Sequence, residues 1–138
     1  MESMANLFTE RDHVYHVKPN NFYGKQGHQK FRMPQKKSGA IILIYAPWCS
    51  HCNDPEWINK YKTMGKLFER NNLNTFAMNA TEPKNEEWME RENINGLPTI
   101  MMANQKGEMK EYEGERELEP MVMEFVNYLT KDRRRRKK

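Results

Sequence analysis

Hydrophobic residues along the chain follow two patterns, a period of two that is typical of strands and a period near 3.6 that is typical of helices. The valines in "HVYHV" alternate with polar neighbours and predict a strand over 14–17. The run "AIILIYA" is apolar throughout and rich in β-branched residues, which indicates a central strand over 40–46 that is covered on both faces. Three further strands are predicted over 73–78, 99–103 and 108–112, and the turn formers in "NQKG" join the last two as a hairpin.

Apolar residues at three- and four-residue spacings predict helices between these strands. One helix is expected over about 57–71 and another within 117–131, while "NEEWMEREN" predicts a short acidic helix that buries Trp88 and Met89. "NNFYGK" indicates a helical turn, which a polar loop over 25–39 follows. The resulting order, βαβαβαββα, predicts an α/β fold of three layers.

The length of 138 residues corresponds to a single domain with one modest core. We expect this domain over 13–130, with a polar extension at 1–12 and a basic tail at 131–138. No stretch approaches the roughly eighteen consecutive apolar residues of a bilayer span, and the opening "MESMANLFTERDH" lacks the basic and apolar order of a secretory signal. A cytoplasmic location is therefore expected, with the virion and the nucleus as alternatives.

Charge is divided unevenly along the chain, although its net value is only +4. Residues 131–138 hold seven Lys or Arg against one Asp, whereas 41–130 hold nine basic against fifteen acidic residues. Because the tail offers nothing apolar to bury, it is expected to be disordered and solvated. Two interpretations of residues 133–138 stay open, a solubilising end and a surface that binds nucleic acid or an anionic membrane.

The two cysteines of the chain, Cys49 and Cys52, lie three positions apart between the central strand and the helix that follows it. A thiol at the start of a helix meets unpaired backbone N–H groups and the positive end of the helix dipole, both of which favour the thiolate. Cys52 is then placed to attack the mixed disulfide that Cys49 forms with a substrate. His51 adds a potential positive charge, which favours the reduced state and a more oxidising disulfide.

Two structural roles for the cysteines compete with this redox role. A zinc site would need Cys49, Cys52 and two of the four histidines, of which only His13 and His16 are closely spaced, and there is no second Cys-x-x-Cys. A structural disulfide would close a very small loop and so constrain the unfolded chain little. We therefore expect a redox-active pair and no metal or organic cofactor.

The stretch "YAPWCSHC" resembles the active site of the thioredoxin superfamily and is most similar to that of protein disulfide isomerase catalytic domains, with Ser50 in place of a glycine. The segments "VKPNNFYG", "AMNATE", "INGLPTI" and "YEGERELEPMVMEFV" are similar to other parts of the same family. The resemblance implies a thioredoxin-like α/β/α sandwich with a central mixed sheet.

The resemblance also implies a role for individual residues. Cys49 corresponds to the exposed nucleophile and Cys52 to the buried resolving thiol, with Trp48 shielding the pair. Pro98 corresponds to the cis-proline that faces the disulfide, and the backbone of Leu97 to the segment that pairs with a substrate chain. A lid over the core and a rigid turn are the structural alternatives for Trp48 and Pro98.

Three positions depart from the family pattern. Leu43 stands where a buried acid usually relays a proton for the resolving cysteine, and Ala77 stands where a lysine usually helps. Pro55 falls early in the helix, where its missing N–H is expected to tilt the first turn. Exchange is therefore expected to stall at the mixed disulfide or to depend on water, His51 or Arg116. Arg116 is similar to a family arginine that approaches the buried thiol, and a surface arginine without that role is the alternative.

Together these residues predict a thiol–disulfide oxidoreductase that acts on protein thiols and disulfides, with a sulfhydryl oxidase or a reductase as its redox partner. The direction of electron flow stays open, because His51 favours an oxidase or isomerase and the missing signal favours a cytosolic reductant. The alternative is a thioredoxin-fold binding protein that holds a partner through the cis-proline groove or the basic tail, with little redox turnover.

Overall fold

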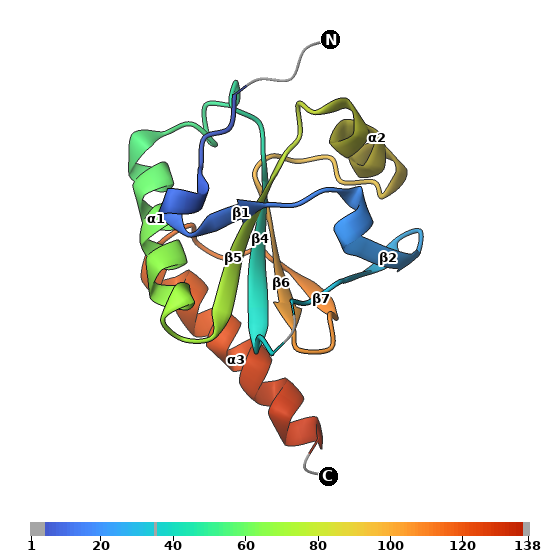
Figure 1. The fold of residues 1–138 in the computed structure, drawn as a ribbon, viewed down its shortest axis with the longest axis vertical. Coiled ribbons are helices and arrows are strands. Elements are labelled where there is room, and N and C mark those ends of the chain that lie inside the picture. Colours follow the sequence, from blue (N-terminus) through green and yellow to red (C-terminus); the bar gives the residue numbers. More distant parts are fainter. Residues whose placement is uncertain (1–4, 35, 137–138) are drawn as a thin grey trace.

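A central sheet of five strands runs through the molecule, in the spatial order β1–β5–β4–β6–β7 (Figure 1). The computed structural model describes the backbone of residues 5–34 and 36–136 and the side chains up to Lys131. The strands are β1 (Val14–His16), β4 (Gly39–Tyr45), β5 (Leu73–Asn79), β6 (Thr99–Asn104) and β7 (Met109–Tyr112). All five predicted strands are confirmed to within one or two residues at each end.

The sheet is mixed, and β4 is its middle strand. β4 pairs in parallel with β5, which itself pairs in parallel with β1, and it pairs antiparallel with β6 on its other side. β7 continues antiparallel to β6. All seven residues of β4 are buried, which accounts for a run that is apolar on both of its faces.

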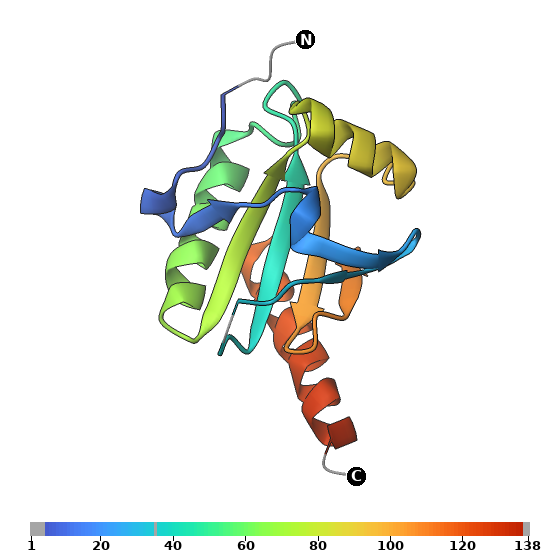
Figure 2. The same ribbon diagram turned by 45° about the vertical axis from the view of Figure 1, so that its right-hand side comes forward.

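Helices and a hairpin cover the two faces of the sheet and complete three layers (Figure 2). α1 (Pro55–Glu69) and α3 (Leu118–Arg136) lie on one face, and α2 (Pro83–Arg91) lies on the other. Because side chains alternate along a strand, Ile41, Leu43 and Tyr45 pack on the α1 side while Ile42 and Ile44 pack on the α2 side. The predicted α/β sandwich with a central mixed sheet is confirmed.

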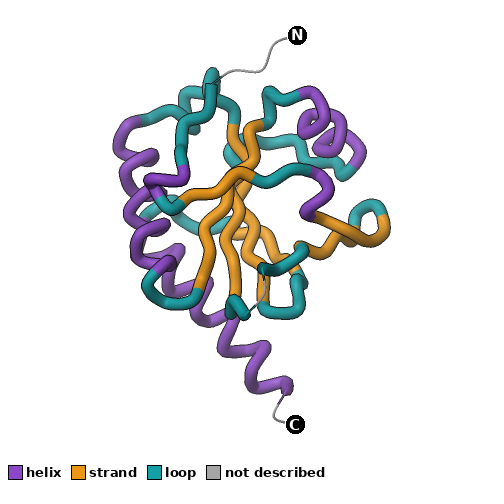
Figure 3. Tube along the Cα trace, in the orientation of Figure 1, coloured by secondary structure: helices purple, strands orange, loops and turns teal. Residues whose placement is uncertain are grey.

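The segment between β1 and β4 differs from its prediction beyond residue 21. A short 3-10 helix over Pro19–Asn21 provides the expected turn, but β2 (Phe22–Lys25) and β3 (His28–Phe31) then form an antiparallel hairpin in place of a loop (Figure 3). Tertiary packing is the reason. The ring of Phe22 stacks on Trp88 with centroids 4.5 Å apart, and the ring centroids of Phe31 and Phe76 are 5.1 Å apart, so the open end of the hairpin is buried against the sheet and α2.

Both ends of the domain also differ from the predicted boundaries. The polar extension was predicted through residue 12, yet Phe8 is buried between the rings of Tyr45 and Tyr61 at 5.5 and 5.4 Å. The tail was predicted as disordered from residue 131, whereas α3 continues through Arg136. Arginine is a good helix former, and positive charge at a helix C-terminus interacts favourably with the dipole, so the backbone stays helical there. Residues 137–138 lie outside the described part of the chain.

Across 5–34 and 36–136, no helix combines the length and the apolar character that crossing a bilayer requires.

Candidate active site

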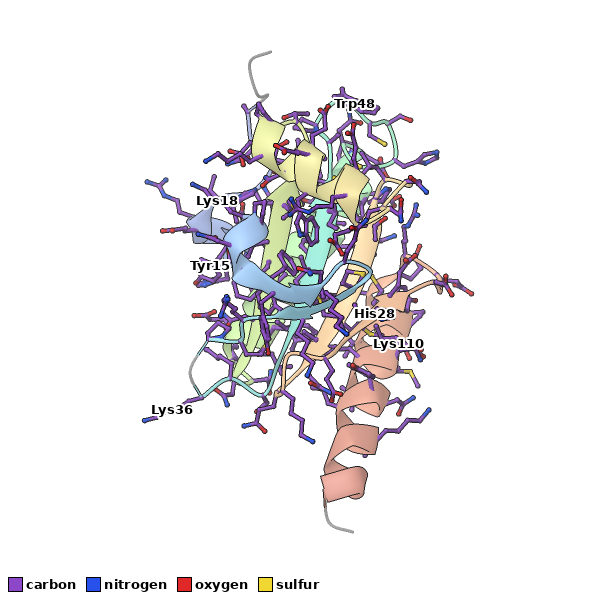
Figure 4. The ribbon with its side chains drawn as sticks, turned by 90° about the vertical axis from the view of Figure 1, so that its right-hand side faces the viewer. Tyr15, Lys18, His28, Lys36, Trp48 and Lys110 are labelled. Atoms are coloured by element: carbon purple, nitrogen blue, oxygen red, sulfur yellow. The ribbon has the colours of Figure 1, made fainter. Side chains whose placement is uncertain are left out.

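Cys49 and Cys52 lie in the turn that connects β4 to α1, beside the exposed Trp48 at one end of the sheet (Figure 4). The backbone N–H of Cys49 donates to Ala46 O at 3.0 Å, and the N–H groups of Cys52 and Asn53 both donate to Cys49 O at 2.9 Å. These bonds close two consecutive turns, over 46–49 and 49–53. The side chain of Asn53 strengthens them by donating to Pro47 O at 3.0 Å.

These turns are separate from the first turn of α1, which corrects the prediction that the cysteines open a helix. α1 begins at Pro55. The first N–H groups of a helix have no partner within the helix, so the missing N–H of proline breaks no hydrogen bond there. The residue before a proline is pushed out of the helical region, and Asp54 accordingly adopts extended angles of φ −64° and ψ 124°. Pro55 therefore starts α1 and does not tilt it, and the groups that act on Cys49 belong to its own turn.

The environment of Cys49 favours the thiolate. Burial acts to raise the pKa of this half-buried thiol, but hydrogen bonds from the Cys52 side chain and from the backbone N–H groups of His51 and Cys52 act in the opposite direction. The positive charge of Arg116 adds to them, so the pKa of Cys49 lies below its ordinary value. His51 thus contributes its backbone N–H, while its imidazole is exposed.

The environment of Cys52 has the opposite effect. Its side chain is fully buried, and this burial is the largest of the effects that raise the pKa of Cys52 well above its ordinary value. Leu43 and Ala77 contribute to that apolar surrounding, because they are direct partners across the β4–β5 ladder and are fully buried in the same core cluster as Cys52. Leu43 and Ala77, the two departures from the family pattern, therefore lie side by side in the sheet.

The loop before β6 completes the site from the other side. The peptide bond between Leu97 and Pro98 is cis, and the Sγ atom of Cys49 lies 3.9 Å from Leu97 O. Arg116 donates from Nη2 to Pro98 O at 3.4 Å. The structure therefore brings together four residues that were predicted from the sequence, Cys49, Leu97, Pro98 and Arg116. Trp48 is 63% exposed, which excludes a role as a lid over the core.

No pattern in the sequence predicts the polar cluster that surrounds the hydroxyl of Tyr45. His16 Nε2 lies 2.8 Å from the hydroxyl of Tyr45, and the backbone N–H of Leu7 donates to the same hydroxyl at 3.2 Å. Burial raises the pKa of Tyr45 to about 12, so it stays protonated at neutral pH. Only the tertiary fold joins them, since Tyr45 is 38 positions from Leu7 and 29 positions from His16 in the chain.

Among the residues that the structure describes, no group of three or more His, Cys, Asp or Glu side chains is arranged to hold a metal ion. His16, one of the histidines considered for a zinc site, is occupied by its contact with Tyr45.

Comparison with known proteins identifies relatives of this chain. The family model described as Thioredoxin matches residues 24–127. Protein disulfide-isomerase A3 from Gallus gallus is 38% identical over 96 residues, which cover 67% of this chain and 17% of that protein. Protein disulfide isomerase-like 2-2 from Oryza sativa subsp. japonica is 27% identical over 124 residues, which cover 89% of this chain and 30% of that protein. The chain thus spans less than a third of the length of either relative.

Solved structures agree on the fold. The first thioredoxin domain of mouse Protein disulfide-isomerase A4 superposes with a TM-score of 0.56 and 20% identity, covering 78% of this chain and 79% of that one. The Trx4 domain of ERdj5 superposes with a TM-score of 0.61 and 14% identity, covering 84% and 95%. With three layers, a mixed sheet and a family model that matches most of its length, the chain belongs to the thioredoxin family.

Proposed function

We propose that this protein is a thiol–disulfide oxidoreductase that acts on protein thiols and disulfides through Cys49 and Cys52. The observation that carries the proposal is the contrast between the two thiols. Cys49 is accessible and its pKa is lowered, whereas Cys52 is buried and its pKa is raised. A nucleophile needs the first environment, and a resolving thiol that waits for a mixed disulfide needs the second.

In the reducing direction, the Cys49 thiolate attacks one sulfur of a substrate disulfide. A bond forms between Cys49 Sγ and that sulfur, and the other substrate sulfur leaves as a thiolate. Cys52 then loses its proton and attacks Cys49 Sγ, which releases the second substrate thiolate and leaves the Cys49–Cys52 disulfide. The substrate gains two electrons, and the reverse sequence donates a disulfide. A sulfhydryl oxidase or a reductase then resets the pair.

The apolar side chains of Leu43 and Ala77 make deprotonation of Cys52 the slow step of these reactions. No carboxylate stands at position 43 to take the proton, so its acceptor is water or a group brought by the substrate. Arg116, which is held at the carbonyl of Pro98, stabilises the thiolates of both cysteines. We therefore expect a long-lived mixed disulfide compared with family members that carry the acid.

Insulin reduction tests the proposal, with the Cys49→Ser and Cys52→Ser variants as controls. Wild-type turnover should exceed both variants, and Cys52→Ser should accumulate a mixed disulfide that Cys49→Ser does not form. Turnover that equals both variants would reject the oxidoreductase and favour a binding protein that uses the same fold. Equilibration of the pair in glutathione buffers then gives the direction of electron flow, since about −180 mV is typical of isomerases and about −270 mV of thioredoxin.

A further inference from the structure

A groove adjoins the cis-proline loop on the α2 face of the sheet. Its volume is ≈ 570 Å³, within the range of sites that hold ligands or peptide side chains. Leu97 and Pro98 form its end nearest the cysteines, and the tip of the β2–β3 hairpin at residues 27–29 forms its far wall. In Figure 4, Trp48 of the cysteine turn lies at the upper end of the molecule and His28 lies lower down, in the hairpin that faces the viewer.

Two hydrogen bonds to the end of α2 hold the tip of the β2–β3 hairpin, which forms the far wall. The side chain of Gln26 donates from Nε2 to Arg91 O at 2.7 Å, and the backbone N–H of Gly27 donates to Glu92 Oε1 at 2.8 Å. Both bonds join residues 65 positions apart in the chain and connect the hairpin turn to the end of α2. The groove is therefore a preformed feature of the folded chain, which lowers the entropic cost of binding.

The groove is continuous with the reactive thiol. Leu97 lines it, and the carbonyl of the same residue lies 3.9 Å from Cys49 Sγ. Arg116 stands at this end as well, because it lines the groove and donates to Pro98 O. A polypeptide whose cysteine meets Cys49 therefore has this groove within reach of its neighbouring residues.

The lining has a distinct chemistry along its length. Met101 and Met109 are half-buried side chains of β6 and β7, and flexible thioethers adapt to apolar side chains of different shape. Glu111 lies opposite Met101 across the β6–β7 ladder, is exposed and lines the same groove. The part remote from Arg116 therefore combines an apolar floor with negative charge.

We propose that this groove selects substrates by the residues beside their reactive cysteine. It binds an extended polypeptide segment with one large apolar side chain on Met101 and Met109 and a basic side chain next to Glu111. Side chains of an extended segment alternate in direction and advance about 3.3 Å per residue, so the apolar residue lies within about two to four positions of the cysteine. This inference rests on the proposed oxidoreductase function and names the substrate class of that site.

Peptides with an activated cysteine provide the test. Each peptide carries its cysteine as a mixed disulfide with 2-thiopyridine, so attack by Cys49 forms the peptide mixed disulfide and releases 2-thiopyridone, whose absorbance gives the rate. One series places Leu or Ser at positions two to four from the cysteine, and another adds Arg or Glu beyond it. The small disulfide 2,2′-dithiodipyridine reports the reactivity of Cys49 without a peptide.

The best Leu peptide should react on the order of tenfold faster than its Ser counterpart, a difference of about 1.4 kcal/mol in the barrier. Met109→Lys should abolish this preference and Met109→Leu should retain it. Met123→Lys, on the exposed face of α3, is the matched control and should change nothing. Each variant should react with the small disulfide at the wild-type rate, which separates a binding defect from a change at Cys49.

Charge reversal gives an independent second measurement with little risk to folding, since Glu111 is exposed. Glu111→Lys should invert the preference for Arg over Glu peptides, and Glu113→Lys, an equal charge change at an exposed position outside the groove, should not. Equal rates for all peptides, with a fast small disulfide, would overturn the inference and leave the oxidoreductase intact. No reaction with either reagent would overturn the proposed function itself.

Discussion

Gly107 anchors the hairpin that forms the far wall of the groove, and its substitution by alanine should destabilise the protein strongly. The backbone N–H of Phe31 donates to Gly107 O at 2.8 Å. Gly107 has a φ of +84°, and a Cβ atom placed on it would stand 2.2 Å from Phe31 O. Because Phe31 O is a backbone atom, this clash is relieved only if the β2–β3 hairpin and the β6–β7 turn move apart.

The expected loss combines three effects. A side chain at this φ costs roughly 1–2 kcal/mol, the broken hydrogen bond costs about 1 kcal/mol, and partial exposure of the Phe31 ring removes part of the roughly 1.5–3 kcal/mol that burial of such a ring supplies. Gly107→Ala should therefore lower the free energy of unfolding by about 3–5 kcal/mol. That is a large fraction of the roughly 5–15 kcal/mol of a typical domain.

Gly27, which lies in the turn of the β2–β3 hairpin, is a matched control for Gly107. Its φ is +81°, almost equal to that of Gly107, but nothing lies within 4 Å of a Cβ atom placed on it. Gly27→Ala should therefore cost only the backbone effect, about 1–2 kcal/mol. Urea unfolding followed by the fluorescence of the buried Trp57 and Trp88 measures both variants. Equal losses in the two would refute the argument that the contact with Phe31 holds the hairpin to the sheet.

Two further substitutions test the site and the core. Because the pKa of Cys49 is lowered, its alkylation by iodoacetamide should reach half its maximal rate at a lower pH than that of an ordinary thiol, and at neutral pH it should exceed that of Cys52 by on the order of tenfold or more. Arg116→Gln should move this midpoint to higher pH, and an unchanged profile would show that the arginine does not act on the thiol. Tyr61→Phe should lower the free energy of unfolding by about 0.5–1.5 kcal/mol, because it removes the hydrogen bond that the buried Tyr61 hydroxyl donates to Phe76 O at 2.6 Å. A loss under about 0.5 kcal/mol in chemical denaturation would contradict this account of the hydroxyl.

The hydrophobic pattern was sufficient to predict those elements whose structure depends mainly on their own residues. The apolar run over 40–46 predicted the central strand, because a strand that is buried on both faces carries apolar residues at nearly every position. The helical spacing of Trp57, Tyr61, Met64 and Phe68 predicted α1, and the same four side chains lie in its buried face.

The hairpin over 22–31 could not be predicted in this way. "FYGKQGHQKF" has few apolar residues and two glycines, so its local composition is that of a loop. Its strands form because Phe22 and Phe31, opposite each other in register, are both buried against residues distant in the chain. The start of α1 after the cysteines was also misjudged, since the motif was assigned to the helix although Pro55 indicates a helix start of its own.

The sequence by itself determined the order of the five strands of the central sheet and of the three α-helices, the spacing of the Cys-x-x-Cys pair and the apolar character of positions 43 and 77, because each depends on neighbours along the chain. The family resemblance implied that Cys52 is the buried thiol, but only the tertiary structure decided which groups surround the two thiols. Leu43 meets Ala77 across two strands, Cys49 meets Leu97 over 48 positions, and the groove joins a hairpin, a helix end and two strands. Contacts of this kind arise when the sheet brings remote segments together, and no local periodicity records them.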